Sequence, residues 1–179
     1  MTLSNQTENK TVNSIANYLN KIIEEKYKKL NSESKELLEN TNIDTNSNVQ
    51  LKLELVNAGL NNLSFVYTKE GKLNGKNVYD SKGSTFYYNG EIKNYDAEGF
   101  KESIKLKAIN EFRKSELYAK YKNQLDKNYE KVIYDNMFLT GNWYLVDNKM
   151  IFLIPANLLG LNSEIASIVK IEIELEEDI

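Results

Sequence analysis

The stretch NMFLTGNWYLVDNKMIFLIP, from Asn136 to Pro155, decides the fold of this chain. It contains the only tryptophan, Trp143, and the only proline, Pro155, and two apolar runs flank the polar residues 147–149. Two apolar runs separated by a short polar segment are typical of a β-hairpin. We therefore predict a buried hairpin here, with Trp143 in the core, and we expect most of the preceding chain to cover it.

The chain before this hairpin begins with a helical pattern. From Val12 to Leu30, apolar residues recur every three or four positions, which places them on one face of a helix. Residues 1–11 are polar, and we predict that they form a disordered N-terminal segment. A run of Asn, Thr, Asp and Ser over residues 40–48 is typical of a loop, so we expect the helix to end before it.

Strand patterns follow this loop. Apolar and polar residues alternate over 49–56 and over 63–67, which predicts two antiparallel strands. The polar, glycine-containing segment 69–75 is predicted as a loop, and residues 77–80 as a short strand. Asn89-Gly90 lies between two β-prone runs. We predict a type I′ hairpin turn there, because both central residues of that turn need a positive φ.

Further helices and a last strand complete the pattern. Asp96 is a candidate N-cap for a helix whose apolar stripe runs from Phe100 to Phe112, and a second helical pattern follows up to Leu125. Apolar residues alternate with charged ones over 168–175, which predicts a final strand with one face in water. Because helices and strands do not alternate strictly, we predict an α+β fold: an antiparallel β-sheet with helices packed on one face.

The length of 179 residues suits one domain or two small, closely packed units. After the disordered segment 1–11, we predict an N-terminal subdomain of helix and β-meander over residues 12–95. A helix plus the C-terminal β-hairpin would form a second subdomain over residues 96–179. We expect the two subdomains to pack as one unit.

Composition excludes several classes of function. The chain has no cysteine and no histidine, which removes disulfides, the usual zinc sites and the Ser-His-Asp mechanism. The formal net charge is −3 and no basic face is concentrated in the sequence, so we expect no nucleic-acid partner. No window has the apolar length of a membrane span, and no signal peptide is evident. We therefore expect a membrane link only through an anchor absent from this chain.

The remaining chemical candidates are weak. Three acidic pairs could resemble the two carboxylates of a glycosidase: Glu24/Glu25, Glu36/Glu39 and Glu172/Glu174. The surrounding patterns place all three on solvent-exposed faces. Residues 72–76 and 82–85 contain fragments of a phosphate-binding loop without its full spacing, and hairpin turns explain them better. We predict no catalytic residue, no metal site and no cofactor. A carboxylate-based hydrolase is the enzyme alternative that remains.

Tyrosine is the residue type that best suits a recognition surface in this chain, because it offers a large rigid ring and a hydroxyl group. The chain has 12 tyrosines, and Tyr79, Tyr87 and Tyr88 fall in the strand-rich region. We name these three as candidate partner-binding residues. The alternative is that they are ordinary core and sheet-surface residues.

One family resemblance rests on residues 142–155, NWYLVDNKMIFLIP. They are similar to the pattern aromatic-Tyr-Leu-x-Asp-x-Gly-Leu-x-Phe-x-Phe-x-Pro, which marks the extracytoplasmic domain of RsiV-type anti-sigma factors and the domain pair before the catalytic domain of PdaC-type peptidoglycan deacetylases. The predicted order of elements also fits. Two family segments are missing: residues 68–72 contain no histidine, and only Pro155 matches the family motif that follows the hairpin.

The resemblance implies a non-catalytic, extracytoplasmic sensor or ligand-binding domain of a bacterial envelope protein that is membrane-anchored in its full-length form. Its partner would be a protein, such as the basic protein lysozyme, or a cell-wall component, and the mild acidity of this chain is compatible with a basic partner. The alternative is a small acidic cytosolic interaction protein of the immunity or inhibitor type, which would have a cytoplasmic location.

Overall fold

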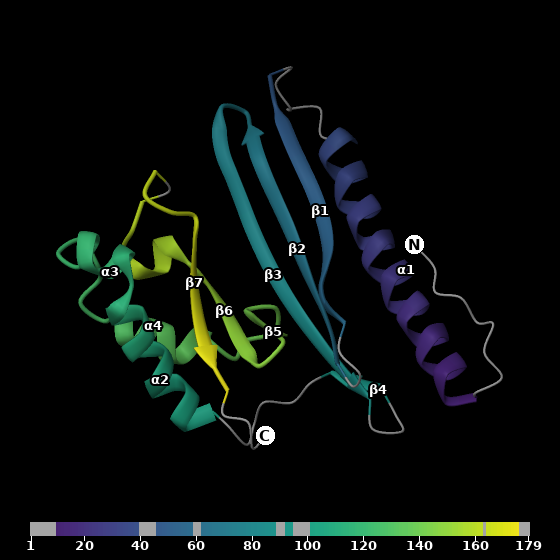
Figure 1. Cartoon of the computed structure of the whole chain (residues 1–179). Coiled ribbons are helices and arrows are strands. Elements are labelled where there is room, and N and C mark those ends of the chain that lie inside the picture. The colour runs from purple at the N-terminus through teal and green to yellow at the C-terminus, as the bar shows by residue number, and fades with distance from the viewer. Residues whose placement is uncertain are drawn as a thin grey trace.

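A computed structural model describes residues 10–39, 46–58, 62–88, 92–94, 101–162 and 164–175 (Figure 1). The elements are α1 (Lys10–Glu39), β1 (Asn48–Ala58), β2 (Asn62–Leu73), β3 (Lys76–Tyr88), β4 (Ile92–Asn94), α2 (Lys101–Lys114), α3 (Glu116–Tyr121), α4 (Tyr129–Asn136), β5 (Trp143–Val146), β6 (Lys149–Pro155), the 3₁₀ helix η2 (Ala156–Leu159) and β7 (Ile168–Glu174).

The strands form two antiparallel sheets, with the orders β1-β2-β3-β4 and β5-β6-β7. Figure 1 shows four layers: α1, the first sheet, the second sheet, and the group of α2, α3 and α4. Each sheet has helices on one face and packs its other face against the other sheet. The predicted α+β class, with antiparallel strands and helices on one face of a sheet, is confirmed.

The first sheet differs from the prediction in its strand boundaries. β2 continues to Leu73, through the segment 69–75 that was predicted as a loop, and the chain turns only at Asn74-Gly75. Both turn residues have positive φ, 51° and 76°, as a type I′ turn requires. β3 then runs without interruption from Lys76 to Tyr88. The turn predicted at Asn89-Gly90 lies outside the described residues.

The helices also differ in extent. α1 begins at Lys10, so residues 10 and 11 are helical and the predicted disordered segment is too long; residues 1–9 lie outside the described ones. Ser115 separates α2 from α3, since its Oγ accepts a hydrogen bond from the Tyr118 amide (3.1 Å) and donates to the Phe112 carbonyl (2.6 Å). The sequence pattern missed α4. Its last residue, Asn136, lies in the stretch assigned to the hairpin, so the hairpin strands begin only at Trp143.

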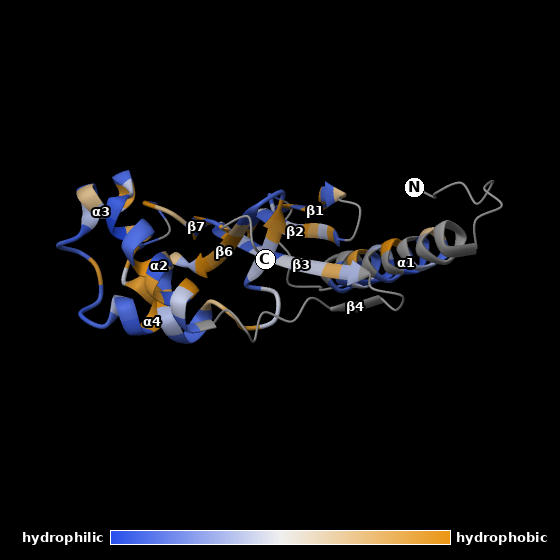
Figure 2. Cartoon of the chain, turned by 60° about the horizontal axis from the view of Figure 1, so that its bottom comes forward, coloured by the Kyte–Doolittle hydropathy of each residue, from blue (hydrophilic) through white to orange (hydrophobic). Residues whose placement is uncertain are grey.

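β6 is the central strand of the molecule because both of its faces are buried. Met150, Phe152 and Ile154 face α2 and α4 in the largest hydrophobic cluster, where Figure 2 shows apolar residues concentrated. Ile151 and Leu153 face the first sheet, in a smaller cluster with Val66 of β2 and Tyr144 of β5. The predicted buried hairpin is therefore the structural centre. Trp143 packs against the largest cluster but remains partly exposed.

The two sheets approach closely at Gly83 of β3. Its amide donates to the Gly141 carbonyl at 2.8 Å, and a Cβ at this position would lie 2.8 Å from the Trp143 carbonyl oxygen. Two residues further along β3, the Thr85 hydroxyl oxygen accepts a hydrogen bond from the Leu145 amide at 2.9 Å. These contacts bind the turn before β5, and β5 itself, to β3.

The first sheet ends at Asn94 and α2 begins at Lys101. The predicted subdomain boundary, at residue 95, lies outside the described residues. Among the helices that the structure describes, none has the length and apolar character needed to cross a membrane.

Candidate binding surface

The three tyrosines proposed from sequence do not form one cluster. Tyr79 and Tyr87 lie on the face of β3 that includes Gly83 and Thr85 and is turned toward β5, because side chains alternate along a strand. They are eight residues apart, which corresponds to about 27 Å along a strand. Tyr79 is 37% exposed and Tyr87 is half-buried. The side chain of Tyr88 lies outside the described ones.

The same face of β3 meets a tyrosine that the sequence did not indicate as a site residue, Tyr144 of β5, whose ring lies beside Gly83. Tyr144 is buried between the sheets. Burial raises the pKa of its hydroxyl, and the charges of Glu172 and Glu54 and the hydroxyl of Tyr79 raise it further. Tyr79 has a raised pKa for similar reasons, burial first and then the charge of Glu70. Each tyrosine has its own glutamate on a neighbouring strand: Glu70 is paired with Tyr79, and Glu172 is paired with Ile151, the strand partner of Tyr144.

We call Tyr79, Tyr144, Glu54, Glu70 and Glu172 the tyrosine seam. Its glutamates come from β1, β2 and β7, so both sheets contribute. The sequence could not indicate this group, because its members are spread over more than 100 residues and meet only where the sheets pack. The hairpin pattern placed Tyr144 in a strand but did not show its neighbours.

Lysines partly neutralise the seam. Lys52 pairs with Glu54 at 2.7 Å, and Lys149 lies 3.7 Å from Glu172 and 3.9 Å from Glu174. The hydrogen bond that Lys52 donates to Glu54, the charge of Glu54 and, more weakly, the charge of Glu70 raise the pKa of Lys52. Among the described residues, Glu70 has no ion-pair partner. Surface pairs of this kind are weak, so a cationic partner could displace these lysines at little cost.

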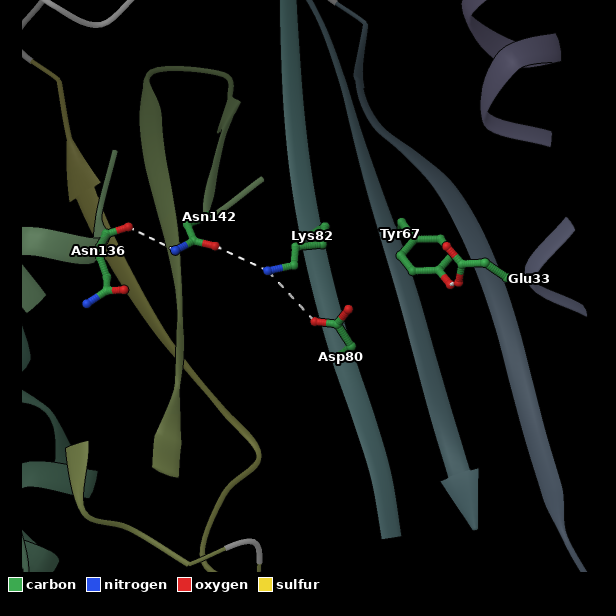
Figure 3. A network of polar contacts seen from close by, with 6 residues as sticks. All are labelled: Glu33, Tyr67, Asp80, Lys82, Asn136 and Asn142. Carbon is green, nitrogen blue, oxygen red and sulfur yellow. Dashed lines mark hydrogen bonds and ion pairs between the residues drawn. The ribbon is translucent and has the colours of Figure 1, made fainter. Parts of the chain in front are cut away.

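A second polar group has a structural role (Figure 3). The Lys82 ammonium donates to the Asn142 side-chain oxygen at 3.4 Å and lies 4.0 Å from Asp80. The Asn142 side-chain nitrogen donates to the Asn136 carbonyl at 2.9 Å. These contacts connect β3 to the end of α4. Across the sheet, the Tyr67 hydroxyl donates to Glu33 of α1.

A cavity of about 30 Å³ lies beside this group, between α1 and the first sheet. Its lining is Lys29, Leu53, Phe65, Tyr67, Lys82 and Ser84. A single water needs roughly 10–15 Å³ measured in this way, so the cavity holds one or two waters and no organic substrate.

In the described structure, the acidic pairs of the sequence lie on exposed faces and the phosphate-loop fragments lie in the hairpin of β2 and β3. Glu24, Glu25, Glu36, Glu39, Glu172 and Glu174 are exposed. Residues 72–76 include the turn between β2 and β3, as expected, whereas residues 82–85 lie inside β3. The hairpin-turn interpretation of residues 82–85 was therefore wrong: Gly83 serves a close approach between backbones. Within the described ranges, no three acidic side chains are grouped so as to hold a metal ion.

Comparison with models of known protein families gives no match to this chain, and comparison with curated proteins gives none.

Proposed function

We propose that this protein is a non-catalytic sensor or ligand-binding domain that recognises a partner through the tyrosine seam. The observation that carries the proposal is the presence of Tyr79 and Tyr144 at the junction of two sheets, each near glutamates of neighbouring strands. Glu70 is paired with Tyr79, and Glu54 is paired with Val66, which packs with Tyr144. Tyrosine provides rigid contact area together with a hydrogen-bonding group, and such residues dominate the affinity of protein interfaces. The exposed ring of Tyr79 is the natural first contact.

The partner that best fits this surface is a basic protein. Lysine and arginine side chains of the partner would pair with Glu54, Glu70 and Glu172, and the apolar parts of those side chains would lie along the Tyr79 ring. The resemblance of residues 142–155 to RsiV-type domains suggests lysozyme as the first protein to test, with a cell-wall fragment as the second. The same carboxylates would repel the phosphates of a nucleic acid.

We further propose that the domain works outside the membrane, to which the full-length protein is anchored. This proposal rests on the same resemblance. Fractionation of the source cells, followed by detection with an antibody to the domain, would test it. Recovery in the cytosolic fraction alone would contradict it and favour the immunity or inhibitor type.

Calorimetric titration with lysozyme tests the binding proposal directly, with an acidic protein of similar size as the negative control. We expect saturable heat with lysozyme only, and weaker binding as salt is added, because salt screens exposed charges. Cell-wall fragments should be titrated in parallel.

Matched tyrosine variants locate the surface. Tyr79→Ala should weaken binding about tenfold or more, as expected for an interface anchor. Tyr27→Ala is the control, because Tyr27 is 61% exposed on α1, away from the seam. Equal losses in both variants, or none in either, would contradict the assignment to the seam. Absence of heat with every ligand would remove these ligands from the proposal.

A further inference from the structure

The outer edge of β1 has no strand beside it in the described chain. β1 pairs only with β2, and no described residue forms a backbone hydrogen bond across its other edge. α1 lies over the face of the sheet rather than at this edge, since Tyr18 contacts Phe86 of β3 and Glu33 accepts from Tyr67 of β2. Figure 2 shows β1 at the end of the row of strands, between the layers of α1 and β6.

The sheet register identifies the free backbone groups. The Gly83 amide points away from β2, because it donates to Gly141. Gly83 pairs with Val66, and Val66 pairs with Glu54. In antiparallel sheets, N–H and C=O groups alternate between the two neighbours, so those of Glu54 point toward β2. The backbone N–H and C=O groups of Leu51, Leu53 and Leu55 therefore point away from β2, toward the free edge.

We propose that this edge pairs with the same edge of a second copy of the chain, antiparallel, about a twofold axis at Leu53. Leu53 then faces Leu53 of the second copy, and Leu51 faces Leu55 on either side. These are the residues with outward-pointing groups, so each pair can exchange both hydrogen bonds. The result is a continuous sheet through both copies.

Charge selects this register. With the axis at Leu53, Lys52 of each copy lies opposite Glu54 of the other, which gives two cross-strand pairs of opposite charge. Moving the axis to Lys52 or to Glu54 would place like charges opposite each other. An axis midway between two residues would pair a residue whose backbone groups point outward with one whose groups point toward β2. It would also join opposite faces of the two sheets.

Two features of β1 support the same axis. Leu55 is 42% exposed on the face of the sheet that bears α1. In the dimer, Leu51 of the second copy would lie opposite Leu55 and cover its side chain. The register irregularity after Leu55 ends the regular part of the strand, so the pairing is confined to residues 51–55. Lysine is a common protection of sheet edges, and a second copy would place a carboxylate, Glu54, opposite Lys52.

The test uses two charge variants of the full chain. Lys52→Glu carries glutamate at both positions and Glu54→Lys carries lysine at both, so each should fail to pair with itself. An equimolar mixture should form a heterodimer, because every facing pair then has opposite charge. Sedimentation velocity over a concentration series measures the masses, and the variants are expected to self-associate at least about tenfold more weakly than the wild type.

Two controls separate pairing from folding. The double variant Lys52→Glu/Glu54→Lys restores both opposite-charge pairs and should regain the wild-type dimer. Lys131→Glu breaks the exposed pair with Asp135 on α4 and should leave the mass unchanged. A wild-type chain that stays monomeric at millimolar concentration would overturn the proposal, and so would a dimer that both single variants retain. A mixture that stays monomeric would overturn the register.

Discussion

At the scale of residues, Gly83 determines how closely the sheets pack. Gly83 lies in the middle of a strand and has no side chain. The ring of Tyr144 and the carbonyl of Trp143 occupy the space that a side chain would need. Glycine inside a strand commonly marks such a close approach. The approach in turn holds the turn at Gly141 and positions Tyr144 for the seam.

Replacing Gly83 with alanine should destabilise the protein. The new Cβ would lie 2.6 Å from Tyr144 Cδ1 and 2.8 Å from the Trp143 carbonyl oxygen, and backbone atoms cannot move aside easily. We expect the free energy of unfolding in urea to fall by about 1–3 kcal/mol or more. The fluorescence of Trp143 should also change, because the sheets must separate locally.

Gly75→Ala is the matched control for this prediction. A Cβ at position 75 meets nothing within 4 Å, so only the positive φ of 76° disfavours it, by roughly 1–2 kcal/mol. The emission of Trp143 should stay the same. If Gly83→Ala changed neither stability nor emission, the close approach of the sheets would be incorrect.

At the scale of elements, α1, a helix of 30 residues, packs along one face of the first sheet. Tyr18 and Ile23 pack against a small cluster centred on Leu63 and Phe65. The Tyr67 hydroxyl donates to Glu33 further along the helix. Burial, followed by the hydrogen bond and the charge of Glu33, raises the pKa of Tyr67.

Tyr67→Phe should loosen α1. The free energy of unfolding should fall by about 1 kcal/mol at neutral pH, from the loss of one hydrogen bond, and amide exchange in α1 should accelerate more than in β6. Because the folded-state pKa of Tyr67 exceeds the unfolded value of about 10, its stabilisation is fully present below pH 10 or so and is lost as pH rises through the folded-state pKa. The variant and the wild type should therefore differ equally at neutral and mildly alkaline pH.

Denaturation in urea at both pH values, with hydrogen exchange, would check this. A difference that already disappears at mildly alkaline pH would contradict the raised pKa. Unchanged exchange in α1 would contradict the role of the hydrogen bond.

At the scale of the whole molecule, β6 couples the two halves. Its side chains alternate between the helical cluster and the cluster that joins the sheets. Leu153 is 1% exposed and belongs to the second cluster, whereas Phe152 is fully buried in the first. The two neighbours therefore allow the halves to be perturbed separately.

Leu153→Ala should cost about 2–5 kcal/mol and Phe152→Ala about 3–5 kcal/mol. Only Leu153→Ala should separate the unfolding of the halves, because it removes contacts between the sheets. In urea, the transition followed by Trp143 fluorescence and that followed by amide exchange in β2 should no longer coincide. Coincident transitions in Leu153→Ala would show that other contacts couple the halves.

The local patterns of the sequence predicted a large part of the fold. Helical spacing over Val12–Leu30 and over Phe100–Phe112, alternation over 168–175 and the apolar runs around residues 147–149 each correspond to an element of the right type. The α+β class followed from their order. The reason is that hydrophobic periodicity and turn residues act over a few positions and are visible without the rest of the chain.

Two local errors show the limits of such patterns. The polar, glycine-containing segment 69–75 was predicted as a loop, although β2 continues to Leu73 and only Asn74-Gly75 forms the turn. α4 was missed because it is short and its apolar residues merge with those of the following hairpin. In both places, neighbouring segments decided between local options of similar quality.

The sequence by itself determined the element types, the buried hairpin and the absence of cysteine and histidine chemistry. Only the tertiary structure decided that there are two sheets, that Gly83 lies where they meet, and that glutamates from three strands lie near Tyr79 or Tyr144. The free edge of β1 also depends on strand order. The physical reason is that packing and electrostatics depend on distances between residues far apart in the chain, whereas sequence patterns report only on near neighbours.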